Sequence, residues 1–172
     1  IYSLTGSPRV RVGAEGFQSA SEQIDPSSLG KTFSVILKEL PGRLQVDIPG
    51  DERLLSTSEW RSNGAFLGRF ASLDVEKKAG SYRIAIDNPY FHHKEIQVTV
   101  ERGKTSQVTV PLQPVDGRLV IGSQPSGARV FINGEETGKT PLEWAAPGGK
   151  YTLQIRRKEH RELVDELRIT RD

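Results

Sequence analysis

Residues 117–155 read GRLVIGSQPSGARVFINGEETGKTPLEWAAPGGKYTLQI, and this stretch favours a small β-sheet domain. Apolar residues alternate with other residues at Val130-x-Ile132 and again at Tyr151-x-Leu153-x-Ile155. Such alternation is typical of strands with one buried face. The dipeptide Asn133-Gly134 tolerates positive φ at both positions, as a type I′ hairpin requires. The stretch therefore predicts antiparallel strands joined by tight turns.

The same alternation recurs along the whole chain and is separated by turn signals such as Pro41-Gly42, Asn63-Gly64 and Gly148-Gly149. The expected strands are centred on residues 10–12, 33–37, 44–48, 82–86, 96–100, 108–112, 130–132, 151–155 and 167–169. The charged segment 156–168 is predicted to be a loop followed by a strand. Many short strands at this spacing predict an all-β chain of small antiparallel, immunoglobulin-like β-sandwiches in tandem.

An internal repeat supports this organisation. Gly42-Arg43-Leu44 recurs as Gly117-Arg118-Leu119 at an offset of 75 residues, and Gly80-x-Tyr82 recurs as Gly149-x-Tyr151 at an offset of 69. A weaker match relates Gly30-Lys31-Thr32 to Gly103-Lys104-Thr105 at an offset of 73. We predict a partial or atypical β-sandwich unit over 1–41 and further β-sandwich units over 42–114 and 115–172. The last unit stops where the preceding one still has the strand at 107–112.

Composition excludes several function classes. The 172 residues include no Cys, so disulfides, thiolate catalysis and thiolate metal sites are excluded. Lys and Arg total 24 against 22 Asp and Glu, so charge gives no argument for a nucleic-acid partner. Only 35% of residues are hydrophobic, and no apolar run is long enough to span a membrane.

Two motifs that resemble chemical sites are better explained by structure. The segment from Gly134 to Thr140 lacks the glycine spacing of a P-loop, so we expect no nucleotide. His92 and His93 are adjacent and point to opposite faces of a strand, so with His160 they make a poor metal site. No nucleophile elbow is present either. We therefore expect no catalytic residues, no metal and no cofactor.

Over residues 117–169 the order of motifs resembles the PEGA family of small β-sandwich modules in bacterial and archaeal envelope proteins. The matching motifs are Pro125-x-Gly127-Ala128, Val130-x-Ile132-Asn133-Gly134, Gly138-x-Thr140-Pro141 and Gly149-x-Tyr151. Residues 33–44 also resemble tandem modules of proteins with a sulfatase-modifying-factor (formylglycine-generating-like) domain. The resemblance implies a non-catalytic periplasmic or extracellular module, with a membrane anchor and a further domain outside these residues.

The repeated motif residues have backbone roles in this interpretation. Glycines supply positive φ or close approach, prolines set turns or strand edges, and the tyrosines pack and form hydrogen bonds through their hydroxyls. The structural residues predicted in this way are Pro125, Gly127, Ala128, Asn133, Gly134, Gly138, Thr140, Pro141, Gly149 and Tyr151.

A second set of residues could form a partner surface. Core packing is the alternative explanation for its aromatic members, and a solvated loop for its basic members. The set consists of Trp60, Tyr90, Phe91, Trp144, Arg156 and Arg157.

The leading hypothesis is a spacer or interaction module that contacts an envelope protein or its own neighbouring domains. Short Pro-containing junctions, such as Leu40-Pro41 and Pro114-Val115, favour semi-rigid connection of the units. The competing hypothesis is a carbohydrate-binding module, which requires exposed aromatic side chains lying together. A third is strand addition to an exposed sheet edge, because an abbreviated unit leaves an edge strand unpaired.

Overall fold

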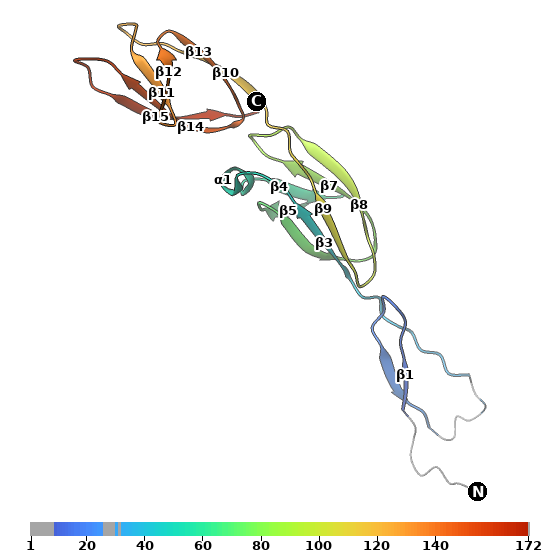
Figure 1. The fold of residues 1–172 in the computed structure, drawn as a ribbon. Coiled ribbons are helices and arrows are strands. Elements are labelled where there is room, and N and C mark those ends of the chain that lie inside the picture. The colour runs from blue at the N-terminus through green and yellow to red at the C-terminus, as the bar shows by residue number, and fades with distance from the viewer. Residues whose placement is uncertain (1–8, 26–29, 31, 172) are drawn as a thin grey trace. The chain divides into compact units, whose positions relative to one another are not determined.

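The computed structural model describes residues 9–25, 30 and 32–171, and their regular secondary structure is almost entirely β (Figure 1). Strands are the main regular structure of the described residues, which confirms the predicted all-β class. A single helical turn, α1 (Glu52–Leu55), follows the N-cap Asp51, whose carboxylate accepts a hydrogen bond from the Arg53 amide. No helix in the described part of the chain is long and apolar enough to cross a membrane.

The chain divides into two compact units. The first comprises residues 1–46, 73–82 and 97–108. Here β1 (Arg9–Val12) pairs antiparallel with β2 (Ala20–Gln23), and β3 (Gly42–Asp47) pairs antiparallel with β6 (Leu73–Lys77).

The other neighbour of β3 is β9 (Thr105–Thr109). Two backbone bonds define its direction: Arg43 N–H donates to Lys104 O at 2.9 Å, and Val110 N–H donates to Asp47 O at 2.8 Å. Residue numbers rise in the same direction on both strands, so β9 runs parallel to β3. The central strand β3 is thereby covered along both edges.

The predicted strand at 33–37 is wrong, because residues 32–38 carry no strand. The chain pairs just after them: the amide of Gln18 donates to Lys38 O, and the amide of Leu40 donates to Gly16 O. Side-chain exposure still alternates along this segment: Val35 and Leu37 are half-buried, and their neighbours are exposed. The pattern is that of a strand, but no described segment provides 33–37 with a ladder partner.

The second unit comprises residues 47–72, 83–96 and 109–172. Its first sheet has the order β5-β4-β7-β8, with β4 (Glu59–Ser62), β5 (Ala65–Arg69), and parts of β7 (Gly80–Asp87) and β8 (Lys94–Val100).

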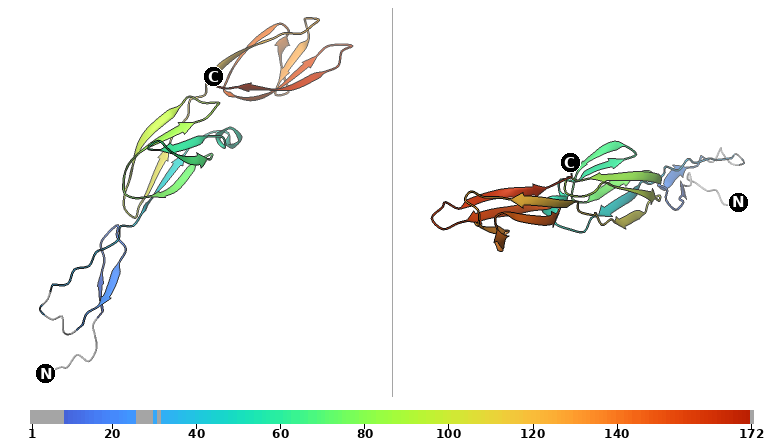
Figure 2. Two further views of the ribbon diagram at one scale, coloured as in Figure 1. Left: turned by 180° about the vertical axis from the view of Figure 1, so that it is seen from behind. Right: turned by 90° about the horizontal axis from the view of Figure 1, so that it is seen from above.

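The rest of this unit is a sandwich of two sheets (Figures 1 and 2). One pairs β10 (Asp116–Ile121) with β13 (Leu142–Pro147). The other has the order β12-β11-β14-β15, with β11 (Arg129–Ile132), β12 (Glu135–Lys139), β14 (Gly149–Arg156) and β15 (Leu163–Ile169). Ile121, Val130, Ile132 and Leu153 form its buried core. The segment 156–168 is a turn followed by a strand, as predicted.

The internal repeat is visible in local geometry. Asn63 and Asn133 both have positive φ, 49° and 50°, and each is followed by a positive-φ glycine. Each asparagine side chain accepts a backbone N–H from the neighbouring strand, Arg83 at 2.8 Å and Thr152 at 2.9 Å. A bulge follows both turns by the same number of residues, with Leu67 and Thr137 as the extra residues. The two hairpins, β4–β5 and β11–β12, are therefore built alike.

Candidate functional site

The candidate site is a junction centred on the turn that follows β7, residues 88–92, which we call the junction segment. Asn88 is 1% exposed and anchors it. Its Nδ2 donates to Leu54 O at 3.0 Å and to Ser58 Oγ at 2.9 Å, while its Oδ1 accepts the Tyr90 amide at 2.9 Å. One buried side chain thus ties the turn to α1, and its polar atoms are hydrogen-bonded as burial requires.

Backbone hydrogen bonds connect the junction segment to residues 113–115 and to Arg171. Val115 N–H donates to Tyr90 O at 3.1 Å, His92 N–H donates to Gln113 O at 2.9 Å, and Arg171 N–H donates to Pro89 O at 2.6 Å. Val115 O accepts the Gly148 amide at 2.6 Å. A Cβ at Gly148 would overlap the Tyr90 carbonyl, so the close approach requires glycine. Several backbone hydrogen bonds therefore hold the segment 113–115, which leads into β10.

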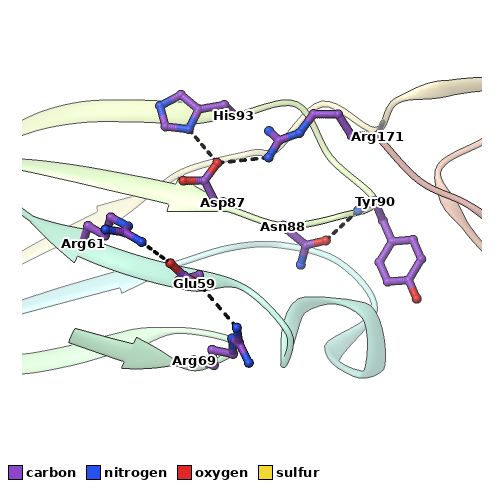
Figure 3. Close-up of polar contacts among 8 residues, drawn as sticks. All are labelled: Glu59, Arg61, Arg69, Asp87, Asn88, Tyr90, His93 and Arg171. Carbon is purple, nitrogen blue, oxygen red and sulfur yellow. Dashed lines mark hydrogen bonds and ion pairs between the residues drawn. The ribbon is translucent and has the colours of Figure 1, made fainter. Parts of the chain in front are cut away.

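Asp87 adds an ionic contact to the junction (Figure 3). His93 Nδ1 lies 2.8 Å from Asp87 Oδ1, and Arg171 Nη2 lies 3.1 Å from the same oxygen. Burial raises the pKa of Asp87, but the hydrogen bonds and charges of His93 and Arg171 outweigh it, so the pKa of this carboxyl is lowered. The ionised form of Asp87 is the form that the junction favours.

We expect Asp87→Asn to lower the free energy of unfolding by no more than about 1 kcal/mol at neutral pH, because the pair is partly exposed. A carboxyl with a lowered pKa stabilises the fold above its ordinary value near 3.9, and this contribution is lost as the pH falls through the folded-state pKa. Urea unfolding at neutral and acidic pH should therefore show the variant and wild type converging in acid. A difference that stays constant with pH would contradict this.

A hollow of about 510 Å³ lies beside these groups. Glu59 lies on its wall between Arg61 at 2.6 Å and Arg69 at 3.4 Å, and the pKa of Glu59 is lowered, chiefly by the hydrogen bond from Arg61. The hollow is lined by Ser56, Thr57, Glu59, Arg69, Asp87, Asn88, Pro89 and Arg171. Both of its carboxylates are paired with cations (Figure 3), an arrangement that suits a structural joint.

The motif residues of 125–151 lie together in the C-terminal sandwich. Thr140 is 4% exposed, and its Oγ1 accepts the Ala128 amide at 3.0 Å. The Thr140 carbonyl accepts the Gly127 amide at 2.8 Å, and the Thr140 amide donates to Ala128 O at 2.9 Å. Pro125 and Pro141 each follow a cis peptide bond. The Pro-x-Gly-Ala and Gly-x-Thr-Pro segments thus hold each other in place.

The remaining motif residues occupy turns and the sandwich interior. Asn133 and Gly134 form the hairpin turn, and Gly138 has a φ of +159° in the bulged strand β12. Gly149 begins β14, where the Tyr151 ring lies against it. The Tyr151 hydroxyl donates to Pro147 O at 2.7 Å, just as the Tyr82 hydroxyl donates to Lys78 O at 2.9 Å. Partial burial raises the pKa of Tyr151.

These segments lie in a region that is similar to a known module. Residues 117–172 match the PEGA domain. The PEGA match covers the sandwich of β10 to β15, and the family is not one of known enzymes. PEGA domains occur in extracellular and periplasmic proteins.

Solved structures add to the comparison. The chain is similar to the Bacillus anthracis TIE protein at 15% identity and a TM-score of 0.50, over 88% of this chain and 34% of that protein. This likeness concerns the β fold, and the chain spans about a third of that protein's length. A DUF3823 family protein from Bacteroides ovatus aligns at 11% identity and a TM-score of 0.33, over 76% of this chain and 97% of that one. No curated protein matches the chain.

The aromatic side chains considered as a carbohydrate surface do not form one. Trp60 is fully buried, and its indole N–H donates to Phe70 O at 2.8 Å. Tyr90 and Phe91 are 4% and 9% exposed at the junction segment. Trp144 is half-buried against the core of the PEGA domain, with its ring edge-on to Tyr151 at 4.8 Å between centroids. Burial therefore favours the alternative explanation, core packing, for Trp60, Tyr90 and Phe91, and a partner surface that includes Trp144 stays a prediction.

The two predicted basic residues make contacts within the PEGA domain. The Arg156 guanidinium lies 4.7 Å from the centre of the Phe131 ring and 2.7 Å from a Glu162 carboxylate oxygen. The Arg157 guanidinium donates to Ser126 O, beside the Pro-x-Gly-Ala turn. Both side chains therefore support the sandwich, and their role toward a partner stays a prediction. Among the described residues, no cluster of His, Asp and Glu is arranged to hold a metal ion.

Sequence reasoning missed Asn88, Asp87 and Arg171. An asparagine followed by a proline is typical of a turn, and it gives no sign that the side chain is buried or reaches a helical turn far back in the chain. The repeat offers one clue. At the offset of 69 that relates Tyr82 to Tyr151, Asn88 corresponds to Arg157, so the two units differ at this point of an otherwise shared pattern.

Proposed function

We propose that the chain is a non-catalytic β-sandwich spacer and interaction module, which holds neighbouring modules in a defined arrangement. This proposal rests on the backbone hydrogen bonds that hold the junction segment. Tyr90 O, Pro89 O and Val115 O each accept a backbone N–H from a different segment. A connection with its backbone groups bonded in this way resists bending, whereas a free linker would leave them to water.

The proposal extends to location and attachment. The PEGA match supports an extracytoplasmic site of action, since domains of this family occur there. The resemblance of residues 33–44 to tandem modules beside a sulfatase-modifying-factor domain supports attachment to a membrane-anchored envelope protein. The partner in this proposal is an envelope protein or a neighbouring domain of the same protein.

Spin labels test the stiffness of the junction, because the chain has no Cys and accepts labels at chosen sites. Lys94 on β8 and Glu135 on β12 are exposed and lie in the same unit. We expect the double variant Lys94→Cys and Glu135→Cys to give a single narrow distance distribution by pulsed electron spin resonance. The physical reason is that the hydrogen bonds of the junction segment would hold the sheet that contains β8 and the sheet that contains β12 in one arrangement.

The matched control inserts a short Gly-Ser linker between Gln113 and Pro114 in the same labelled protein. This insertion interrupts the bonds around Tyr90 and Val115 while leaving both sheets intact, so the distribution should broaden. Equally broad distributions with and without the insertion would contradict the spacer function. Labels placed within the PEGA domain alone should give a narrow distribution in both proteins, which shows that the domain still folds.

A further inference from the structure

The strand β5 lies at one end of the sheet β5-β4-β7-β8, so among the described residues one of its sides has no strand neighbour (Figure 1). Its counterpart in the following repeat, β12, is likewise the outer strand of its sheet. The open side is therefore part of the architecture of the repeat itself. An edge strand with unpaired backbone groups is a template for another strand.

The two outer strands differ in their side chains. The offset of 70 residues between the two hairpin turns places the charged Glu136 of β12 where Phe66 stands in β5. Charges on an edge strand discourage its pairing with another strand, whereas Phe66 is apolar and 57% exposed. The other exposed aromatic residue here, Phe70, has its ring against Gly68 of its own chain. Phe66 is therefore the aromatic side chain of this edge that a partner can cover.

The register with β4 indicates which backbone groups of β5 face the open side. Ala65 directly follows the two-residue turn and bonds to β4, and Ser58 O accepts the Phe70 amide at 3.1 Å. In an antiparallel ladder, hydrogen-bonded pairs alternate with pairs whose backbone groups point away from each other. Phe66 and Arg69 occupy the alternate positions, so their N–H and C=O groups point toward the open side.

Phe66 and Arg69 also share one face of the sheet. A bulge between them adds one residue to β5, so these two positions point to the same side although they are three apart in sequence. Phe66 is opposite Arg61, and Arg69 is opposite Glu59. The Glu59 carboxylate lies 2.6 Å from the Arg61 guanidinium and 3.4 Å from that of Arg69. This face of β5 therefore presents a phenyl ring beside a guanidinium.

We propose that β5 binds β5 of a second copy of the chain as an antiparallel strand, with Phe66 of each copy opposite Arg69 of the other. A second copy is the fitting partner because the strand is complementary to itself in this register. Outward N–H and C=O groups meet their counterparts, and each guanidinium lies against a phenyl ring in a cation–π contact. Both copies use the same surface, so the contact is isologous and closes as a dimer.

The cross-strand pair supplies a charge test. Phe66→Arg places two guanidinium groups opposite each other and should raise the dissociation constant of the dimer more than about tenfold. Adding Arg69→Glu to this variant places opposite charges at the same positions, so the double variant should associate again. Glu136→Arg makes the matched change on β12 and should leave association unchanged. All three substituted side chains are exposed, so the fold should tolerate the changes.

The experiment is sedimentation velocity of the 172-residue chain at concentrations up to about 1 mM, because a contact made by one short strand is weak. We expect the mean mass of the wild type, Glu136→Arg and the double variant to rise with concentration toward twice the monomer mass. Phe66→Arg should stay monomeric. Circular dichroism checks that each variant keeps its β-structure.

A wild type that stays monomeric would overturn the proposal and would leave this edge to a strand of another protein. A mean mass that passes the dimer would also overturn it, because the proposed contact closes. A double variant that stays monomeric, a Phe66→Arg chain that associates like the wild type, or a Glu136→Arg chain that loses association would each contradict the pairing of β5. These results do not depend on the spacer function, which the labelled junction tests separately.

Discussion

Trp60→Ala should lower the free energy of unfolding by about 4 kcal/mol, the largest effect we expect from a single substitution. Trp60 is fully buried in β4, and no larger side chain is buried as completely among the described residues. Its removal leaves a cavity and also an unpaired Phe70 carbonyl, which the indole N–H now satisfies at 2.8 Å. Equilibrium urea unfolding followed by far-ultraviolet circular dichroism measures the loss.

Val120→Ala is the matched control, because this side chain is 73% exposed and its truncation should change stability by less than about 0.5 kcal/mol. A loss of less than about 1 kcal/mol for Trp60→Ala would show that the indole does not pack as described. It would also reopen the carbohydrate-stacking role for Trp60.

Asn88→Ala should lower the free energy of unfolding by about 3 kcal/mol, since it leaves buried partners without hydrogen bonds. The buried Ser58 hydroxyl and the Tyr90 amide lose their Asn88 partners together. The same substitution should broaden the distance distribution between labels at residues 94 and 135, because Asn88 anchors the junction segment. Urea unfolding measures the loss of stability of this variant, and the spin-label measurement shows whether its distance distribution broadens.

Asn63→Ala provides the comparison for Asn88. Asn63 is exposed, and its side chain accepts one backbone N–H, from Arg83. We expect a loss of about 1 kcal/mol and no broadening. If Asn63→Ala matched Asn88→Ala in both measurements, the special role of the junction segment would be refuted.

The sequence predicted the strands and turns well where local chemistry decides them. Alternation around Val130 and Tyr151 located β11 and β14, and the Asn-Gly dipeptides located both hairpins. It failed at residues 33–37, where the alternation is present but pairing depends on a partner strand. The short helix α1 was also missed, because four residues are too few to show helical periodicity.

The candidate site was less predictable for a related reason. Asn88 reaches Leu54 and Ser58, and Arg171 reaches Asp87, across long stretches of sequence. Each is a residue type that usually marks surface or turn. Nothing in a single sequence distinguishes the buried Asn88 from the exposed Asn63. The aromatic residues were identified as important, but only the fold shows that Trp60 and Tyr90 are interior.

The hydrogen bonds among Tyr90, Val115 and Gly148 are formed by main-chain groups, and the only side-chain requirement is a glycine at position 148. Most other side chains at this connection can therefore change without breaking these bonds. Gene duplication could lengthen such a chain by one repeat at a time without inventing a new connection. Side chains over most of each copy would then be free to diverge toward separate tasks.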